Sequence, residues 1–169
     1  ILDLAVTFKR LAVNPVQGVT RPRQSLTKRR YLKVIEVERL ADAAGDHADM
    51  ILTLAYCGLR FGEFAALRVS SVDPARRRFA IEESVTEVNG QLVWSAPKDH
   101  QRRSVPYPDF LSAAISTRMA GKSPEDPLFP APTGGFMRIG NARRDWFDPA
   151  VRAARLGGLT PHELRHTAA

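Results

Sequence analysis

The sequence predicts a mainly α-helical domain that carries a small three-stranded antiparallel sheet, an α+β fold. Apolar residues recur at helical spacing near both ends of the chain, and the middle switches to short, partly alternating runs separated by turn residues. With 169 residues and 44% hydrophobic content, the chain is long enough for one domain with its own core. We therefore expect one folded domain with a short appendage.

The first part of the chain is predicted to be helical. The expected helices span residues 1–13, 34–44 and 48–59. Asn14-Pro15 ends the first, because the residue before a proline is disfavoured in the α region. The other two would form a helical hairpin around Gly45-Asp46, although Lys33 stands where a Ser, Thr or Asp cap is expected.

The middle and the end of the chain predict strands and then further helices. The expected strands are Arg78–Glu83, Gln91–Ser95 and Arg103–Pro106, which together would form the sheet. The expected later helices are Phe110–Met119 capped by Asp109, Asn141–Leu156 ended by Gly157-Gly158, and one that begins at Thr160-Pro161. Asn89-Gly90 is typical of a hairpin turn, and residues 121–135 read as an exposed loop.

The net charge of +7 is concentrated at the N-terminus. Residues 1–33 hold one acid, Asp3, and these basic residues: Lys9, Arg10, Arg21, Arg23, Lys28, Arg29, Arg30 and Lys33. The remaining 17 basic and 17 acidic residues cancel. A basic arm on a neutral body is suited to DNA or RNA, because neutralising phosphates releases counterions. A solvated linker that only aids solubility is the alternative.

The sequence shows no membrane or secretory segment. No run approaches the roughly 18 apolar residues of a membrane span, and the N-terminus lacks the pattern of a signal peptide. We therefore expect a cytoplasmic protein without a membrane partner. Cys57 is the only cysteine, so no internal disulfide can form.

The first candidate site lies in residues 58–67, Gly-Leu-Arg-Phe-Gly-Glu-Phe-Ala-Ala-Leu. Arg60 follows an apolar helix, where burying a guanidinium is costly unless it has a partner. Glu63 is close enough in sequence to be that partner. The pair either points Arg60 into a cleft or simply holds a turn together.

The second candidate is the basic segment at residues 97–106, Pro-Lys-Asp-His-Gln-Arg-Arg-Ser-Val-Pro. Lys98 would lie on a hairpin before a basic strand that contains Arg102 and Arg103. A lysine on a loop can reach into a groove and donate a proton or bind a phosphate. It can equally be a solvated turn residue.

The third candidate is Thr-Pro-His-Glu-Leu-Arg-His-Thr at residues 160–167. His162 and Arg165 are three residues apart, so on a helix they share a face and can address one anion. The segment also contains His-Glu-x-x-His, in which His162 and His166 would bind zinc with Glu163 as the base. That zinc hydrolase is a remote alternative, because a third ligand is not evident nearby.

Taken together and in this order, the three segments resemble the catalytic domain of the tyrosine recombinases, in the phage integrase branch. The resemblance implies the fold of DNA breaking-rejoining enzymes, here C-terminally incomplete. It divides the chain into the end of a core-binding domain (1–13), a basic interdomain linker (14–30) and a truncated catalytic domain (31–169).

The resemblance also implies a role for each candidate residue. Arg60 and Arg165 would clamp the scissile phosphate, Lys98 would protonate the leaving 5′ oxygen, His162 would assist proton transfer and Glu63 would orient Arg60. No metal or cofactor is implied, because the arginines supply the positive charge. Further contacts with double-stranded DNA attachment sites are expected from Lys28, Arg29, Arg30, Arg102 and Arg103. The complete protein is expected to assemble as a tetramer on DNA.

One departure from the family pattern concerns the nucleophile, a tyrosine that follows the His-x-x-Arg segment. The tyrosines of this chain are Tyr31, Tyr56 and Tyr107, all upstream of that segment. The complete protein is expected to perform site-specific recombination through a 3′-phosphotyrosyl intermediate. This chain alone is expected to bind DNA without cleaving it. A non-catalytic DNA-binding module is the alternative.

Overall fold

Helices α2 (Val34–Ala44) and α3 (Ala48–Cys57) form the expected helical hairpin in the computed structural model, which describes residues 1–20, 30–96 and 102–168. Val37, Leu40 and Ala41 are the buried face of α2, at the spacing of one helical stripe. A short 3-10 turn at residues 45–47 joins the two helices. Helix α3 ends at Cys57 rather than at residue 59, because Gly58 adopts the left-handed conformation with φ of 60°.

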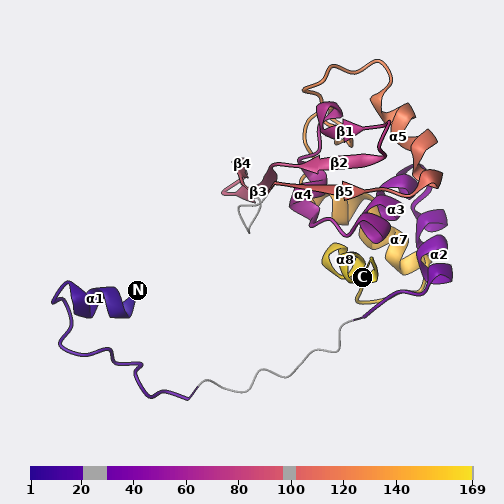
Figure 1. The fold of residues 1–169 in the computed structure, drawn as a ribbon. Coiled ribbons are helices and arrows are strands. Elements are labelled where there is room, and N and C mark those ends of the chain that lie inside the picture. Colours follow the sequence, from indigo (N-terminus) through magenta and orange to yellow (C-terminus); the bar gives the residue numbers. More distant parts are fainter. Residues whose placement is uncertain (21–29, 97–101, 169) are drawn as a thin grey trace.

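A three-stranded antiparallel sheet is present, but its members differ from the prediction. Its strands, in spatial order, are β1 (Val72–Asp73), β2 (Arg78–Ile81) and β5 (Arg103–Pro106) (Figure 1). Phe79 and Ile81 of β2 are buried, and the alternating Ala80 is exposed. The sheet therefore has one face on the core and one face toward solvent.

The predicted strand Gln91–Ser95 belongs to a separate hairpin. It is β4, and it pairs with β3 (Ser84–Val88), a strand that the sequence pattern does not predict. Asn89 and Gly90 form the turn with φ of 50° and 77°. Two positive φ values are what a two-residue hairpin turn requires, so this turn joins β4 to the strand immediately before it. The predicted run to Glu83 also ends earlier, at Ile81.

The later helices are short. They are α4 (Phe61–Ala65), α5 (Ser112–Met119), α6 (Ile139–Ala142), α7 (Asp148–Ala153) and α8 (Pro161–Thr167). The cap predicted at Asp109 is wrong. Residues 109–111 form a 3-10 turn instead, and the Asp109 carboxylate accepts a hydrogen bond from Arg77 at 2.6 Å.

The predicted helix 141–156 is interrupted. Residues 143–147 form a π turn between α6 and α7, and Pro149, which has no N–H to donate, follows it. The helix ends before Gly157, because Arg155 adopts φ of 56° and the Leu156 amide donates to the Val151 carbonyl. This 6→1 bond is the C-terminal motif that usually uses glycine.

The N-terminal helix is shorter than predicted. Helix α1 covers Leu2–Thr7 instead of residues 1–13, and none of its residues is buried. A helix of this length is only marginally stable without packing, and Lys9 already adopts φ of 54°. Part of the predicted linker, residues 21–29, lies outside the described residues.

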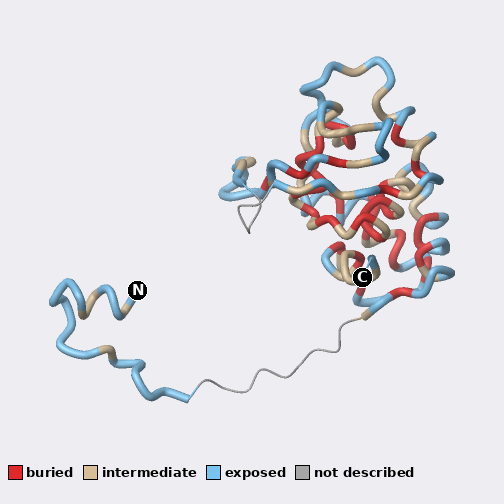
Figure 2. Tube along the Cα trace, viewed as in Figure 1, coloured by how far each residue is buried: buried red, intermediate tan, exposed pale blue. Residues whose placement is uncertain are grey.

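The core lies between the sheet and the helices (Figure 2). Phe64 of α4 stacks on Phe129 at 4.6 Å between ring centroids. Leu164 of α8 and Leu54 of α3 are fully buried, and α3 and α8 contact each other. Burying such a side chain contributes roughly 1.5–3 kcal/mol, so α8 is held on α3 by its apolar face. This packing places Arg165, on the polar side of α8, close to Glu63 of α4.

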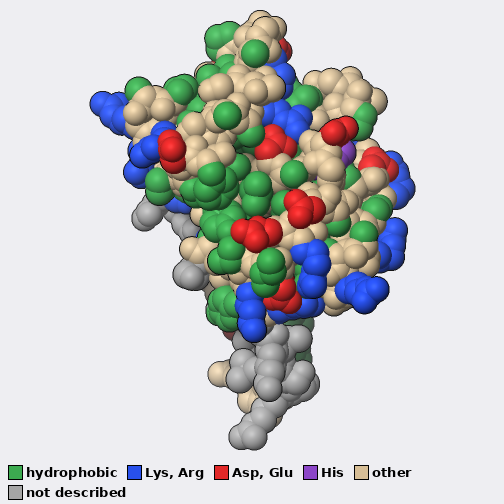
Figure 3. Space-filling view, turned by 90° about the vertical axis from the view of Figure 1, so that its right-hand side faces the viewer, with side chains coloured by type: hydrophobic (Ala, Val, Ile, Leu, Met, Phe, Trp, Pro, Cys, Tyr) green, Lys and Arg blue, Asp and Glu red, His purple; other side chains and the backbone are tan. Residues whose placement is uncertain are grey.

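Acidic and basic side chains are interspersed on the face of the molecule shown in Figure 3, with apolar side chains between them. Exposed Val34, Ile35 and Phe110 contribute to the apolar surface of the chain. This mixture agrees with the cancelling charges of residues 34–169.

Candidate phosphate-binding site

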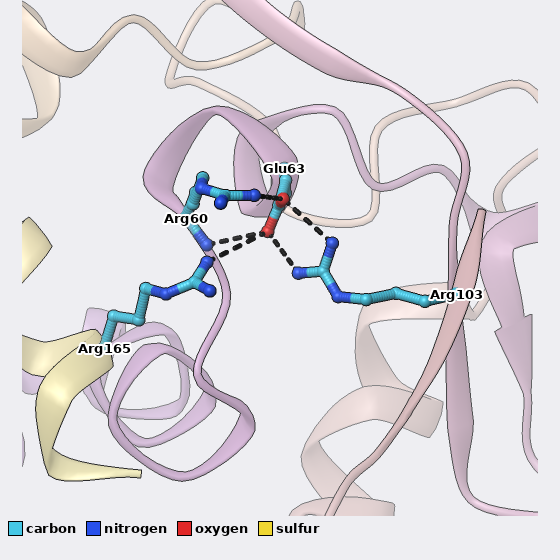
Figure 4. Close-up of polar contacts among 4 residues, drawn as sticks. All are labelled: Arg60, Glu63, Arg103 and Arg165. Carbon is cyan, nitrogen blue, oxygen red and sulfur yellow. Dashed lines mark hydrogen bonds and ion pairs between the residues drawn. The ribbon is translucent and has the colours of Figure 1, made fainter. Parts of the chain in front are cut away.

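The buried carboxylate of Glu63 is the centre of the site. Its side chain has no exposed surface, and three arginines from three separate elements approach it (Figure 4). Arg60 Nη1 lies 2.9 Å from Oε1, and Arg165 Nη1 lies 3.8 Å from Oε2. The structure thus brings together Arg60 and Arg165, two of the predicted site residues that are 105 positions apart in the sequence.

Arg103 is the third arginine of this cluster. Its Nη1 donates to Oε1 of Glu63 at 3.0 Å, and its Nη2 donates to Oε2 at 2.6 Å. This is the two-pronged geometry in which a guanidinium and a carboxylate bind most strongly. We refer to Arg60, Glu63, Arg103 and Arg165 as the arginine cluster.

The local sequence explains the position of Arg60. Gly58 ends α3 in the left-handed conformation, Leu59 is buried, and Arg60 becomes the N-cap of α4. Glu63 is the third residue of that helix, and its Oε2 accepts the backbone N–H of Arg60 at 2.9 Å. A glutamate here is half of a capping box, so the same carboxylate begins the helix and binds the arginines.

Burial and hydrogen bonding shift the pKa of Glu63 in opposite directions. Burial alone would raise the pKa of the carboxyl group, but hydrogen bonds from Arg103 and Arg60 outweigh it and leave the pKa below its ordinary value. Glu63 is therefore ionised at neutral pH, as an anion that holds cations must be.

The β3–β4 hairpin is packed directly against the first turn of α4. A Cβ atom on Gly62 would lie 2.6 Å from the Ser84 hydroxyl and 2.7 Å from the Val85 carbonyl, so no side chain fits at that position. At the turn of the hairpin, Arg138 donates to Glu87 at 2.6 Å and to the Gly90 carbonyl at 2.7 Å. The hairpin is thus attached at both its ends.

Arg68 provides a further attachment of β4. Its guanidinium lies 4.8 Å from the ring centroids of both Trp94 and Phe136, and those rings meet edge to face. Such cation–π contacts contribute about 0.5–2 kcal/mol each. Strand β4 precedes Lys98 by three residues, so the chain enters the Lys98 segment from a fixed strand.

A hollow of about 460 Å³ opens beside Arg60. Its lining includes Arg60 and Glu63 from the arginine cluster, Ser84 and Ser95 from the hairpin, and Arg138. Each arginine of the cluster keeps about 30% of its side chain exposed, while Glu63 keeps none. The cluster therefore combines partly exposed arginine side chains with a buried anion.

The other predicted site residues have different surroundings. His162 is exposed on the first turn of α8, and its ring meets the ring of His166 at 5.2 Å. Lys98, Lys28 and Arg29 lie outside the described residues. Arg102 is 79% exposed and lies 3.7 Å from Glu82.

Arg30 makes contacts within the domain and keeps 36% of its side chain exposed. Its Nη1 donates to the carbonyls of Leu156 and Gly157 at 3.4 and 3.2 Å, and its Nη2 lies 3.5 Å from Glu36. The next residues continue the contact, since the Leu32 amide donates to the Thr167 hydroxyl at 3.2 Å. The residues at and just after the end of the linker are thus attached to the connection between α7 and α8 and to the last residue of α8.

Glu163 in the His-Glu-x-x-His segment has a structural role. Its Oε2 accepts hydrogen bonds from the backbone N–H of Thr160 at 2.7 Å and from the Thr160 hydroxyl at 3.0 Å, and these bonds cap α8.

Within residues 1–20, 30–96 and 102–168, no three His, Cys, Asp or Glu side chains are grouped to hold a metal ion. In the same part of the chain, no helix combines the length and apolar character that a bilayer span requires.

These features define a helical domain with an arginine cluster, and its sequence and fold both have known relatives. Residues 27–169 match the model of the phage integrase family, and the chain therefore belongs to that family. No curated protein has a sequence that matches this chain.

Solved tyrosine recombinase structures share the fold. The Tn1549 transposon integrase in complex with transposon right end DNA matches with a TM-score of 0.80 and 20% identity. XerA recombinase matches with a TM-score of 0.64 and 23% identity, and a lambda integrase tetramer bound to a Holliday junction with 0.63 and 16%. Each match covers 98% of this chain, which spans 60%, 57% and 48% of the respective relatives. The predicted fold class is thereby confirmed.

We expect Glu63→Gln to lower stability by about 1–3 kcal/mol at neutral pH, because it removes charged hydrogen bonds. The folded pKa of Glu63 lies below the ordinary value of an unfolded glutamate. Ionised Glu63 therefore stabilises the fold above the unfolded pKa, and this contribution is lost as the pH falls through the folded pKa. In urea unfolding, the difference between wild type and Glu63→Gln should shrink as the pH is lowered from about 6 to about 3.

Glu125→Gln, at a side chain that is 77% exposed, is the control for this measurement. A difference between wild type and Glu63→Gln that stays constant over the same pH range would contradict the assignment of an ionised, arginine-bound Glu63.

Proposed function

We propose that the arginine cluster is the phosphate clamp of a site-specific DNA recombinase. One observation carries the proposal: Arg60 and Arg165 converge on the ionised Glu63. Arg60 lines the hollow beside the hairpin, and Arg165 lines a separate hollow with Tyr56 and His166. Guanidinium groups bind phosphate oxygens with two parallel hydrogen bonds, and a fixed pair of them is suited to a DNA phosphate. Membership of the phage integrase family supports the same conclusion.

In the proposed reaction, the clamp stabilises the transition state of strand transfer. Negative charge spreads over the non-bridging oxygens of the phosphate as the nucleophile attacks, so donors that are already in place bind the transition state more strongly than the ground state. Arg60 and Arg165 supply these donors. Glu63 positions these two arginines. Its carboxylate is buried and accepts the backbone N–H of Arg60, so it stays in place when an arginine side chain moves.

Proton transfer in this proposal falls to Lys98 and His162. Lys98 protonates the leaving 5′ oxygen. Its segment connects strand β4 to strand β5, whose first residue, Arg103, belongs to the arginine cluster. His162 assists from α8, the helix that also carries Arg165. No metal or cofactor enters the reaction.

The chain alone is proposed to bind DNA without cleaving it. Two of its tyrosines pack against aromatic rings. Tyr107 is buried against Phe79, and Tyr56 meets Phe110 edge to face. Tyr31 lies against His166, outside the segment where the family places its nucleophile. A tyrosine from a C-terminal segment would attack the phosphate and form the 3′-phosphotyrosyl intermediate.

The surrounding parts of the chain fit a DNA-bound assembly. We propose that residues 1–13 end a core-binding domain, that 14–30 form a basic linker along DNA, and that 31–169 belong to the catalytic domain. Lys28, Arg29, Arg30 and Arg102 would add phosphate contacts, and the complete protein would act in the cytoplasm as a tetramer on attachment sites. The tetrameric lambda integrase on a Holliday junction, a structural relative, supports the assembly.

We expect Arg165→Ala to weaken binding to duplex DNA about tenfold and to reduce the slope of log affinity against log salt by about one. Removal of one phosphate contact causes both effects. Arg118→Ala is a matched control, since Arg118 forms a two-pronged pair with Asp49 elsewhere in the domain. Fluorescence anisotropy at several salt concentrations measures the affinities.

The same measurement separates the clamp from a non-catalytic DNA-binding module. A module that binds through its basic arm loses affinity when residues 1–33 are deleted and is almost unaffected by Arg165→Ala. That pattern would refute the clamp.

Strand transfer is tested by trapping a covalent complex on nicked suicide duplexes taken from the ends of the genetic element that encodes the chain. We expect no adduct from the chain alone. We expect an adduct when a tyrosine-bearing C-terminal segment of a relative is added as a separate polypeptide, and its loss in Arg60→Ala or Arg165→Ala. An adduct formed by the chain alone, or one that survives both substitutions, would contradict the proposal.

A further inference from the structure

Arg103 differs from the other two arginines in how it binds Glu63. It contacts both carboxylate oxygens, at 3.0 and 2.6 Å, whereas the side chains of Arg60 and Arg165 each approach Glu63 through one nitrogen, at 2.9 and 3.8 Å. A two-pronged pair fixes the plane of the carboxylate, which a contact through a single nitrogen does not. Arg60 also reaches both oxygens, but it uses one side-chain nitrogen and its backbone N–H. Arg103 is therefore the arginine of the cluster whose guanidinium alone holds the plane of the carboxylate.

The sheet holds Arg103 in this position. Arg103 begins β5 and is paired in register with Ile81, a buried residue of β2. Successive residues of a strand point to opposite faces, so Arg103 shares the inward face with Val105. Arg102 comes immediately before β5 and is 79% exposed. Two adjacent arginines with the same chemistry therefore face different surroundings.

We propose that Arg103 is a positioning residue, which fixes Glu63 so that Arg60 and Arg165 are held in the geometry of the phosphate clamp. This inference rests on the proposed function of the cluster. It assigns Arg103 to the binding of Glu63 rather than to a direct contact with DNA, the role that the sequence suggested.

Loss of Arg103 has a specific consequence. The carboxylate of Glu63 is fully buried, and a buried charge that loses its strongest partner must find compensation from its remaining neighbours. Arg60 and Arg165 are those neighbours, and closer pairing with Glu63 turns them away from a phosphate. If Glu63 is neutral, this competition does not arise, so the effect of removing Arg103 depends on the charge of Glu63.

A double-mutant cycle on duplex DNA binding tests this dependence, with Arg103→Met, Glu63→Gln and the double variant. We expect Arg103→Met to weaken binding about tenfold in the wild-type background and less than about twofold in the Glu63→Gln background. Arg118→Met, which breaks the equivalent pair with Asp49, controls for general loss of stability and should leave affinity unchanged. An equal loss in both backgrounds would show a direct DNA contact and overturn the inference.

Arg103→Lys keeps the test decisive if Arg103→Met does not fold. Lysine retains the charge but cannot form the two-pronged pair. Positioning therefore predicts that Arg103→Lys weakens binding about tenfold, whereas near wild-type binding would overturn it. If wild-type binding does not depend on Arg165, the proposed function itself fails. If it does depend on Arg165 while Arg103 and Glu63 act independently, only the inference about Arg103 fails.

Discussion

Glu63 is a fully buried carboxylate, and its partners determine the architecture of the site. Removing an ion from water costs several kcal/mol, so the charge is tolerated only with close, well-oriented hydrogen bonds. The backbone of α4, a side chain of β5 and a side chain of α8 approach or bind this one group. The anion thus fixes where three distant segments of the chain meet, and the arginine side chains around it stay partly exposed.

The remaining fold supports this meeting point. Leu164 anchors α8 on α3, the pairing of β5 with β2 sets the direction of Arg103, and Gly62 allows the β3–β4 hairpin to lie against α4. These contacts are apolar or backbone contacts, which resist small displacements because protein interiors are close-packed. A rigid arrangement is what preorganised binding of a phosphate requires, since no reorganisation is then needed as charge develops.

Sequence reasoning recovered the parts of this arrangement that local chemistry determines. The α2–α3 hairpin, the start of α8 and the Arg60–Glu63 pair all follow from residues within a few positions of one another, and the structure confirms them. The strand pairing in the sheet could not be predicted in this way, because short strands with partial alternation do not specify their partners. The face of Arg103 depends on the pairing of β5 with β2, so its contact with Glu63, 40 positions away, was not evident from the sequence.

The most direct measurement of the central claim is an NMR titration of the isotopically labelled chain with a short DNA duplex, observing the arginine side-chain Nε–H signals. If the arginine cluster binds a DNA phosphate, the signals of Arg60 and Arg165 should shift in proportion to bound duplex, while that of Arg118 stays in place. If other arginines shift and those of Arg60 and Arg165 do not, DNA binds elsewhere on the chain and the cluster is not a phosphate clamp.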